Sequence, residues 1–348
     1  MKTVCIVCGG RSHEHEISLM SAYSVLCNID RTKYDVHTII IDENGSFFHT
    51  QDLGELKNEG WKKLNELRPC IIAPDPKYRG ILVEKENGFE NIKIDVFFPV
   101  LHGENGEDGV IQGVFKMSGV PYVGSGVLAS ASCMDKEVTH IRLDSAGIKT
   151  ARYITARVGA DIEAIDREIK ESFGYPVFVK PANAGSSVGV GRAECINCLI
   201  KALETAFSVD KKVLIEECLV GAEVECAVLG NEEPIAADYI GEIVPEVEFY
   251  DFDAKYVSGT TTLNIPANLP AEVSKNIRKT AVEAYKVMDC QGLSRVDFFA
   301  KENGEIVLNE INNLPGFTSI SMYPKLFEAS GIKYSELIDK LIETAAVK

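Results

Sequence analysis

The chain has 348 residues, of which 45% are hydrophobic and 25% charged, and its 36 Lys+Arg against 52 Asp+Glu give a formal net charge of −16. This length favours two or three domains, and the acidic balance argues against nucleic acid or an anionic membrane as a partner, because both attract basic surfaces. No apolar run approaches the roughly 20 residues of a membrane span, and the N-terminus has the pattern of a strand and not of a signal peptide. The ten cysteines are therefore expected to be reduced thiols of a cytoplasmic protein.

The first third of the chain alternates predicted strands and helices. Residues 4–8 form a continuous apolar run, which is typical of a strand covered on both faces, and a Gly-Gly turn and a helical pattern follow it. Residues 36–41 and 94–101 are further predicted strands, and the polar stretch 50–91 is expected to hold short strands and turns. The pattern predicts an N-terminal α/β domain over residues 1–130.

A smaller central domain is predicted over residues 131–225. It begins with a long, polar, helix-like stretch at Met134. Residues 176–180, 213–217 and 224–230 have the apolar character of strands, and we assign them to this second unit.

The remainder, residues 226–348, is predicted to form a C-terminal domain. It contains two predicted strands, 295–299 and 305–312, and then helices. Residues 241–264 combine aromatic and charged side chains with a glycine, and loops of this length often cover active sites. We expect a catalytic lid there.

Two CxxC spacings occur in the sequence. Cys5 and Cys8 lie in a predicted strand, where positions three apart face opposite sides, so they are not expected to share a metal ion. Cys195 and Cys198 fit one face of a helix, but no second pair of ligands lies nearby. Buried or incidental thiols are the favoured interpretation, and a metal or redox role is the alternative.

A strand-ending lysine, Lys180, leads into a segment rich in glycine and serine up to Gly191. Glycine lets backbone N–H groups approach an anion, serine adds hydroxyl donors, and the lysine adds positive charge. The segment is not a Walker A loop, because the GxxxxGK[ST] pattern is missing from the sequence. It is a candidate phosphate-binding hairpin, with a flexible turn as the alternative.

Two neighbouring predicted strands near the C-terminus carry polar side chains at alternate positions. Arg295 and Asp297 share one face of the first strand, and Glu310 and Asn312 share one face of the second. If the two faces coincide, carboxylate and amide oxygens meet, which are ligands suited to Mg²⁺. A solvent-facing polar stripe is the alternative.

Two loops follow predicted strands of the N-terminal domain. One contains His102 and three glycines, and in open α/β sheets ligands bind beyond the carboxyl ends of strands. The other contains Glu14 at the start of a predicted helix, where a carboxylate also simply complements the helix dipole. Each loop is a candidate ligand contact, with a solvated turn or a structural carboxylate as the alternative.

Together these clusters resemble the D-alanine–D-alanine ligase family within the ATP-grasp superfamily, over nearly the whole chain. The resemblance implies an α/β protein with the ATP-grasp fold and an N-terminal α/β preATP-grasp domain. The segments that carry it occur in the family's order: residues 9–18, 102–113, 185–189, 249–256, 295–297 and 309–319.

The resemblance implies ATP and Mg²⁺ as cofactors and assigns binding residues to both. The residues that match the family's nucleotide site are Lys136, Lys180, Ser187, Glu216, Cys218, Leu219, Glu223 and Lys255. Two Mg²⁺ ions, which Mn²⁺ can replace, are expected on Asp297, Glu310 and Asn312.

The resemblance also implies catalytic residues. Glu14 is expected to hold the ammonium group of the first D-alanine, and Ser186 and Tyr256 to connect to Glu14 through hydrogen bonds that close the site. Arg295 and the backbone N–H of Gly316 are expected to stabilise the tetrahedral oxyanion. The implied reaction is ATP-dependent formation of D-alanyl-D-alanine through a D-alanyl phosphate, for peptidoglycan precursor synthesis, in a cytoplasmic homodimer.

The expected substrate contacts are His102, near the carboxyl group of the first D-alanine, and Ser321 and Met322, around the second. Members of the family that make D-Ala–D-Ala often have Leu at the last position, whereas relatives that accept D-serine or D-lactate often have Arg. Methionine is apolar and close to leucine in volume, so it suits an alanine methyl group. D-alanine is the expected second substrate, and D-serine is the alternative.

Three other functions are less well supported by the sequence. A different ATP-grasp ligase should lack the segments around Glu14 and His102, which are present. A dinucleotide-dependent oxidoreductase needs GxGxxG, but Ala129 replaces the third glycine after Gly124 and Gly126. A non-catalytic relative should have lost a metal ligand or the arginine, and none is missing.

Overall fold

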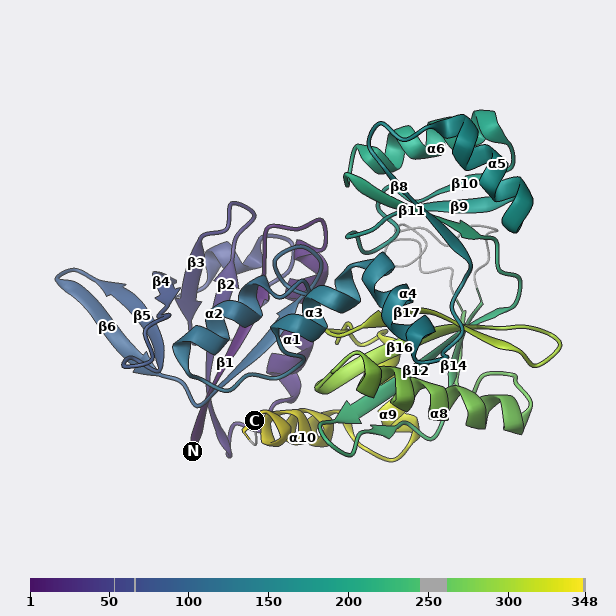
Figure 1. Ribbon diagram of the computed structural model, residues 1–348. Coiled ribbons are helices and arrows are strands. Elements are labelled where there is room, and N and C mark those ends of the chain that lie inside the picture. Colours follow the sequence, from purple (N-terminus) through teal and green to yellow (C-terminus); the bar gives the residue numbers. More distant parts are fainter. Residues whose placement is uncertain (53, 66, 245–261, 347–348) are drawn as a thin grey trace.

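The computed structural model describes residues 1–348 except 53, 66, 245–261 and 347–348, and it contains three β-sheets (Figure 1). The central sheet and its two helices stand apart from the other two sheets, and the C-terminal helix α10 returns to the N-terminal domain. The mixed α/β class expected from the sequence is confirmed.

The N-terminal domain is a seven-stranded sheet in the order β6-β5-β4-β3-β2-β1-β7. The buried strand β1 pairs in parallel with β2 and β7, and helices cover both of its faces. Cys8 packs with residues of α1, whereas Cys5 packs with residues of α2, so the two thiols face opposite sides as predicted. The elements are β1 (Lys2–Gly9), α1 (His15–Asn28), β2 (Tyr34–Ile41), β3 (Phe47–Thr50), η1 (Gly60–Lys63), β4 (Arg68–Ile72), β5 (Gly80–Lys85), β6 (Gly88–Lys93), β7 (Val96–Leu101) and α2 (Val110–Ser118).

The central domain has a four-stranded antiparallel sheet in the order β10-β9-β11-β8, with two helices on one face and a hydrophobic core of its own. Two helices connect it to the N-terminal domain. Asp135 caps the second of them by accepting a hydrogen bond from the backbone N–H of Val138. The elements are α3 (Val127–Met134), α4 (Lys136–Ser145), β8 (Tyr153–Arg157), α5 (Ile162–Ser172), β9 (Val177–Pro181), β10 (Gly191–Ala193), α6 (Ile196–Phe207) and β11 (Lys212–Glu217).

The C-terminal domain has a sheet in the order β15-β14-β12-β16-β17, with β13 beside β12. Residues of α9 and α10 share one hydrophobic core with β1, β7 and α1, and Phe98 meets Phe317 edge to face. The N- and C-terminal domains are therefore joined by packing. The elements are β12 (Ala222–Gly230), β13 (Ile235–Ala236), β14 (Gly241–Val244), β15 (Thr262–Asn264), α8 (Ala271–Val287), β16 (Gly292–Ala300), β17 (Ile306–Asn312), α9 (Met322–Ala329) and α10 (Tyr334–Ala346).

One strand was assigned to the wrong sheet. Residues 224–230 were predicted to belong to the central unit, but β12 pairs with β16 along its whole length in the C-terminal sheet. An apolar strand pattern reports burial and says nothing of which sheet the strand joins. The predicted boundary between residues 225 and 226 consequently falls inside β12, and that between 130 and 131 falls inside α3.

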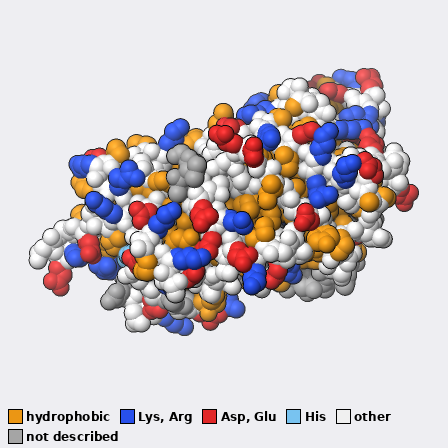
Figure 2. Space-filling view, turned by 90° about the horizontal axis from the view of Figure 1, so that it is seen from below, with side chains coloured by type: hydrophobic (Ala, Val, Ile, Leu, Met, Phe, Trp, Pro, Cys, Tyr) orange, Lys and Arg blue, Asp and Glu red, His pale blue; other side chains and the backbone are white. Residues whose placement is uncertain are grey.

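Within the described parts of the chain, no helix has both the length and the apolar character that crossing a membrane requires. Figure 2 shows one face of the molecule, on which acidic and basic side chains are interspersed around groups of hydrophobic ones. Scattered apolar groups are normal on protein surfaces and do not by themselves mark an interface.

Candidate active site

A cavity of about 450 Å³ lies where the N-terminal domain, the glycine-rich segment and the C-terminal sheet meet. Most of the predicted site residues line it, although they come from distant parts of the sequence. Those in its wall are Glu14, His102, Ser186, Glu223, Arg295, Asp297, Glu310, Asn312, Gly316, Ser321 and Met322.

The polar faces of β16 and β17 coincide as predicted. Asp297 is paired with Glu310, and Arg295 with Asn312, across the antiparallel ladder. The Asn312 amide Nδ2 donates to an Asp297 carboxylate oxygen at 3.0 Å and to a Glu310 oxygen at 3.3 Å. Asparagine can turn its amide oxygen toward the same point, which would complete a set of hard oxygen donors suited to Mg²⁺.

The proposed metal ligands include two carboxylates, those of Asp297 and Glu310. Within the described residues, no group of three or more His, Cys, Asp or Glu side chains is placed to hold a metal ion. Magnesium ordinarily takes only one or two carboxylates and fills its other positions with water and phosphate oxygens. The donor set therefore fits a metal ion that arrives with a nucleotide.

Arg295 is held between acids of two strands. Its Nε lies 2.8 Å from an Asp297 oxygen and 3.1 Å from an oxygen of Glu225 on β12. Burial alone would lower the pKa of the guanidinium, but Asp297 and Glu225 raise it well above its usual value. A fixed positive charge therefore points into the cavity.

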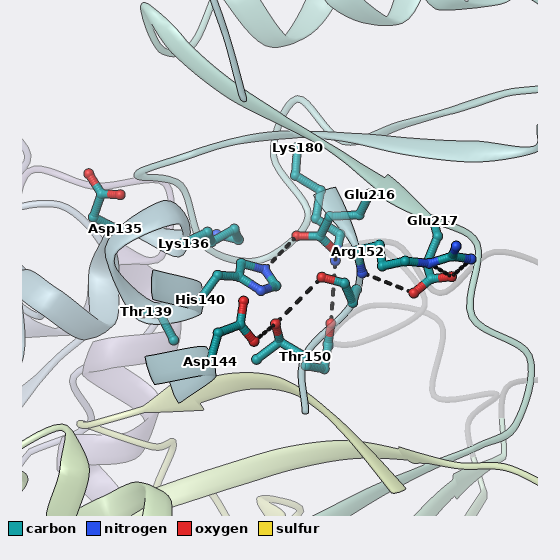
Figure 3. Close-up of polar contacts among 12 residues, drawn as sticks. Asp135, Lys136, Thr139, His140, Asp144, Thr150, Arg152, Lys180, Glu216 and Glu217 are labelled. Carbon is teal, nitrogen blue, oxygen red and sulfur yellow. Dashed lines mark hydrogen bonds and ion pairs between the residues drawn. The ribbon is translucent and has the colours of Figure 1, made fainter. Parts of the chain in front are cut away.

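A second charged cluster lies between the central sheet and α4, and Figure 3 shows Lys180 and His140 pointing at Glu216. Lys180 Nζ lies 2.6 Å from one Glu216 oxygen, and His140 Nε2 lies 3.2 Å from the other. Burial favours the neutral acid, but Lys180 and His140 hold the pKa of the Glu216 carboxyl at about 2.

Lys180 also reaches the C-terminal sheet. Its Nζ lies 3.3 Å from the side-chain oxygen of Asn309, the residue before Glu310 on β17. Asn309 also lines the main cavity, so this contact brings the lysine of the hairpin next to the strand that carries Glu310.

Lys136 lies at the first turn of α4, beside the glycine-rich segment. Its Nζ donates to the backbone oxygen of Ala184 at 2.6 Å, and it lines a smaller hollow that shares Gly185 and Glu310 with the main cavity. The next residues of the segment, Ser186 and Ser187, have positive φ angles of 48° and 59°. Positive φ is costly for non-glycine residues and is often found at functional sites.

Glu14 connects the N-terminal domain to this segment, because its carboxylate accepts a hydrogen bond from the Ser186 hydroxyl. Two glycines lie close to the Glu14 carboxylate, one in the His102 loop and one in the glycine-rich segment. A Cβ atom added to Gly103 would lie 2.7 Å from the carboxylate, and one added to Gly185 would lie 3.2 Å from it. Gly103 also has a positive φ of 71°, so glycine is favoured there by the backbone, and a larger residue would displace the Glu14 carboxylate.

His102 is buried in the same wall, with its Nε2 3.3 Å from the Ser21 hydroxyl. Burial lowers the pKa of its imidazole, although the nearby Glu14 carboxylate acts in the opposite direction. A neutral imidazole keeps one N–H, which can donate a hydrogen bond to a substrate carboxylate.

The opposite wall is formed by the turn before α9. The Ser321 hydroxyl accepts a hydrogen bond from the backbone N–H of Thr318 at 3.0 Å, and it would lie 2.8 Å from a Cβ added to Gly316. Met322 begins α9, is buried, and packs so closely on Gly241 that a Cβ there would lie 2.2 Å from its sulfur. This end of the cavity is tight around Met322, and it is lined by both apolar and polar side chains.

Four of the remaining predicted residues lie outside the main cavity or outside the described residues. Cys218 and Leu219 are partly exposed in the connection between β11 and β12, outside the wall of the main cavity. Lys255 and Tyr256 lie outside the described residues, as does most of the expected lid. The two ends of that segment, β14 and β15, pair with each other.

Three residues of the site were missed by the sequence interpretation. Glu225 follows Glu223 by two positions on β12 and so shares its face, and His140 follows Lys136 by four positions on α4, so both spacings carried a signal. Glu107 lies in the His102 loop and lines the cavity. Burial raises the pKa of its carboxyl well above the usual value, and the Glu14 carboxylate adds to the effect.

The chain matches two family models, "D-ala D-ala ligase N-terminus" over residues 3–125 and "D-ala D-ala ligase C-terminus" over residues 143–343. It is 48% identical to the D-alanine–D-alanine ligase of Acetivibrio thermocellus, with 99% of this chain and 96% of the relative covered. It is also 48% identical to that of Clostridium acetobutylicum, with coverage of 99% and 98%.

Solved structures of the same family superpose over nearly the whole chain. The D-alanine–D-alanine ligase from Coxiella burnetii has a TM-score of 0.87 at 34% identity, covering 100% of this chain and 96% of its own. The VanG D-Ala:D-Ser ligase from Enterococcus faecalis has a TM-score of 0.89 at 39% identity, covering 99% of both chains. These matches confirm the expected ATP-grasp fold, and they show that this chain belongs to the D-alanine–D-alanine ligase family.

Proposed function

We propose that this chain joins two D-alanine molecules into D-alanyl-D-alanine and converts one ATP to ADP and phosphate. One observation carries the proposal. Asp297, Glu310 and Glu14 line one cavity. Asn309, also in its wall, contacts Lys180, and Ser186 of the glycine-rich segment donates a hydrogen bond to Glu14. Curated D-alanine–D-alanine ligases that are 45–48% identical over 99% of the chain support the same activity.

ATP is proposed to lie between the central and C-terminal sheets. Lys136 and Lys180 would contact its phosphates, Glu216 with the backbone of Cys218 and Leu219 would meet the adenine, and Glu223 would hold the ribose. Ser187 and Lys255 are proposed as further contacts. A ligase of this family from Bacillus anthracis, 29% identical with a TM-score of 0.74, has been solved complexed with ATP.

The first step transfers the γ-phosphoryl group to the carboxylate of the first D-alanine, forming an acyl phosphate and ADP. Glu14 would orient the substrate by binding its ammonium group, and His102 would contact its carboxyl group. Phosphoryl transfer depends mostly on alignment and on neutralisation of charge. Asp297, Glu310 and Asn312 would hold the Mg²⁺ ions, which supply that neutralisation when bound.

In the second step the amine of the second D-alanine attacks the acyl carbon. The C–N bond forms first and gives a tetrahedral intermediate, which collapses when the C–O bond to phosphate breaks and phosphate leaves. The proton lost by the amine ends on the released phosphate. Negative charge develops on the carbonyl oxygen, and Arg295 and the backbone N–H of Gly316 are proposed to stabilise it. Because Glu225 and Asp297 already fix the guanidinium, its alignment costs little during the reaction.

The second substrate is proposed to be D-alanine because of Met322. The methionine is buried and confined by Gly241, so a small methyl group suits this end of the cavity, lined also by Ser321. D-serine is the competing substrate, since a D-Ala:D-Ser ligase is among the solved structures that superpose.

Other expectations remain proposals. Ser186 and Tyr256 would close the site with Glu14, and the segment 241–264 would act as the lid. We further propose a cytoplasmic homodimer that supplies peptidoglycan precursors. An N-terminal domain to residue 130, a central domain to 225 and a C-terminal domain remain the proposed division.

Product analysis tests the proposal. Purified protein with ATP and Mg²⁺ is offered D-alanine, D-serine and D-lactate together, and the products are identified by mass spectrometry. D-alanyl-D-alanine should dominate, and ADP release in a coupled assay should require D-alanine. ADP release without dependence on D-alanine would refute the proposal, and D-alanyl-D-serine as the main product would replace it with the D-serine alternative.

A further inference from the structure

A pair of exposed thiols lies at the start of α6, outside the wall of the active-site cavity. The sulfur atoms of Cys195 and Cys198 are 3.5 Å apart, and both residues are free and exposed to solvent. A disulfide requires the sulfur atoms to approach to about 2.05 Å, which a small change in side-chain torsion can supply at this separation. Neither residue has a part in the proposed ligase reaction.

Cys195 occupies the N-cap position of the helix. Its backbone is extended, with φ −161° and ψ 172°, and α6 begins at the next residue. The first N–H groups of a helix have no partner within the helix, and an acceptor on the N-cap side chain can meet them. The Cys195 side chain makes no capping hydrogen bond here, but it lies at the positive end of the helix dipole, which favours a negative charge.

The charge state of Cys195 agrees with this position. The backbone N–H of Cys198, the Cys198 thiol and the backbone N–H of Asn197 lower the pKa of the Cys195 thiol, and they outweigh the opposing effects of desolvation and of the Glu194 charge. A lowered pKa and solvent access both favour reaction of a thiol, and Cys195 combines the two.

The other cysteines do not form a second pair of exposed thiols this close together. Burial raises the pKa of the thiols of Cys5, Cys8, Cys70 and Cys226. Cys133 and Cys290 have sulfur atoms 3.7 Å apart, but Cys290 is buried. Cys27 is exposed and faces the hydroxyl of Tyr23.

The element that presents the pair is well anchored. Strand β10 pairs with β9 and ends at Ala193, two residues before Cys195. On the helix, Leu199 is fully buried in the core of the central domain. The two thiols therefore stay near each other without the loop ordering that would oppose their reaction.

We propose that Cys195 and Cys198 form a redox-active dithiol that exchanges with low-molecular-weight disulfides. The Cys195 thiolate attacks one sulfur of the small disulfide, forms a mixed disulfide and releases one thiolate. The Cys198 thiolate then attacks the Cys195 sulfur, the intramolecular disulfide forms, and the second small thiolate leaves. The two protons lost by the protein end on the two released thiols, and the reaction is reversible.

The test uses the full-length reduced protein and oxidised glutathione near pH 7, with acid quenching and peptide mass mapping over time. The wild type should form the Cys195–Cys198 disulfide. Cys198→Ser should accumulate one glutathione on Cys195, because the second step is blocked. Cys195→Ser should react at Cys198 at least about tenfold more slowly, since the remaining thiol lacks the N-cap position.

Cys27→Ser is the matched control, because it removes an exposed thiol that has no role in the proposed exchange. It should form the Cys195–Cys198 disulfide at the wild-type rate, and all three reduced variants should keep the ligase activity of the wild type, which checks their folding. Glutathione on Cys27 as fast as on Cys195 would overturn the proposal. So would equal rates in Cys198→Ser and Cys195→Ser, or a Cys133–Cys290 disulfide formed while Cys195 stays reduced.

Discussion

Replacing Glu216 by glutamine tests the charged cluster between the central sheet and α4. Glu216 is buried, and its pKa falls from the usual 4.5 to about 2 because of Lys180 and His140. At roughly 1.4 kcal/mol for each pH unit, this difference corresponds to about 3 kcal/mol of stability at neutral pH. Glu216→Gln should therefore lower the free energy of unfolding by about that amount. The substitution also removes the negative charge that compensates the buried Lys180 ammonium.

The pH dependence gives the sign of the effect. A carboxylate whose pKa is lowered by folding stabilises the protein above its unfolded pKa, and this contribution is lost as the pH falls through the folded value. The difference between wild type and Glu216→Gln should therefore be constant from pH 7 to pH 5 and decline to about half near pH 3. Urea unfolding of the nucleotide-free proteins, followed by circular dichroism at each pH, measures it.

Glu217 provides the control, because it is the next residue on the same strand and pairs with the exposed Arg152 at 2.6 Å (Figure 3). Exposed ion pairs contribute about 0–1 kcal/mol, so Glu217→Gln should have a small effect. Equal costs for the two variants, or a Glu216→Gln cost that is unchanged near pH 3, would refute the reasoning.

Three further predictions concern the cavity. Arg295→Ala should reduce kcat by about 10²–10³ while calorimetry shows nearly unchanged ATP binding; loss of ATP affinity as the main defect would contradict an oxyanion role. Met322→Arg should shift the ratio of D-Ala–D-Ser to D-Ala–D-Ala product upward in a mixed-substrate assay, and an unchanged ratio would remove Met322 from the second-substrate site. Glu310→Gln should weaken Mn²⁺ binding, measured by spin-resonance titration with nucleotide present, whereas wild-type affinity would exclude Glu310 as a ligand.

The local patterns of the sequence were sufficient for the strands that carry the metal-binding candidates and for the first strand of the N-terminal domain. The apolar run of residues 4–8 predicted the buried strand β1, and the alternation of Arg295 with Asp297 and of Glu310 with Asn312 predicted two polar faces that do coincide. These inferences succeed because side-chain direction in a strand depends only on the period of two along the backbone.

Such local patterns do not predict which sheet a strand joins. Residues 224–230 were recognisable as a strand, yet their pairing with β16 depends on contacts with residues far along the chain. The same long-range pairing places Glu225 beside Arg295, and the interpretation of the sequence assigned Glu225 no role.

Sequence alone determined which residue types could do the chemistry, since carboxylate, guanidinium and lysine side chains in the right order identified the family. Tertiary structure decided which of them share one cavity and what their charge states are. The pKa values of Glu216 and Glu107 depend on burial and on charged side chains brought near them from distant positions in the sequence, and burial does not exist until the chain has folded. The N-cap position of Cys195 likewise distinguishes a reactive thiol pair from two cysteines that merely share a spacing.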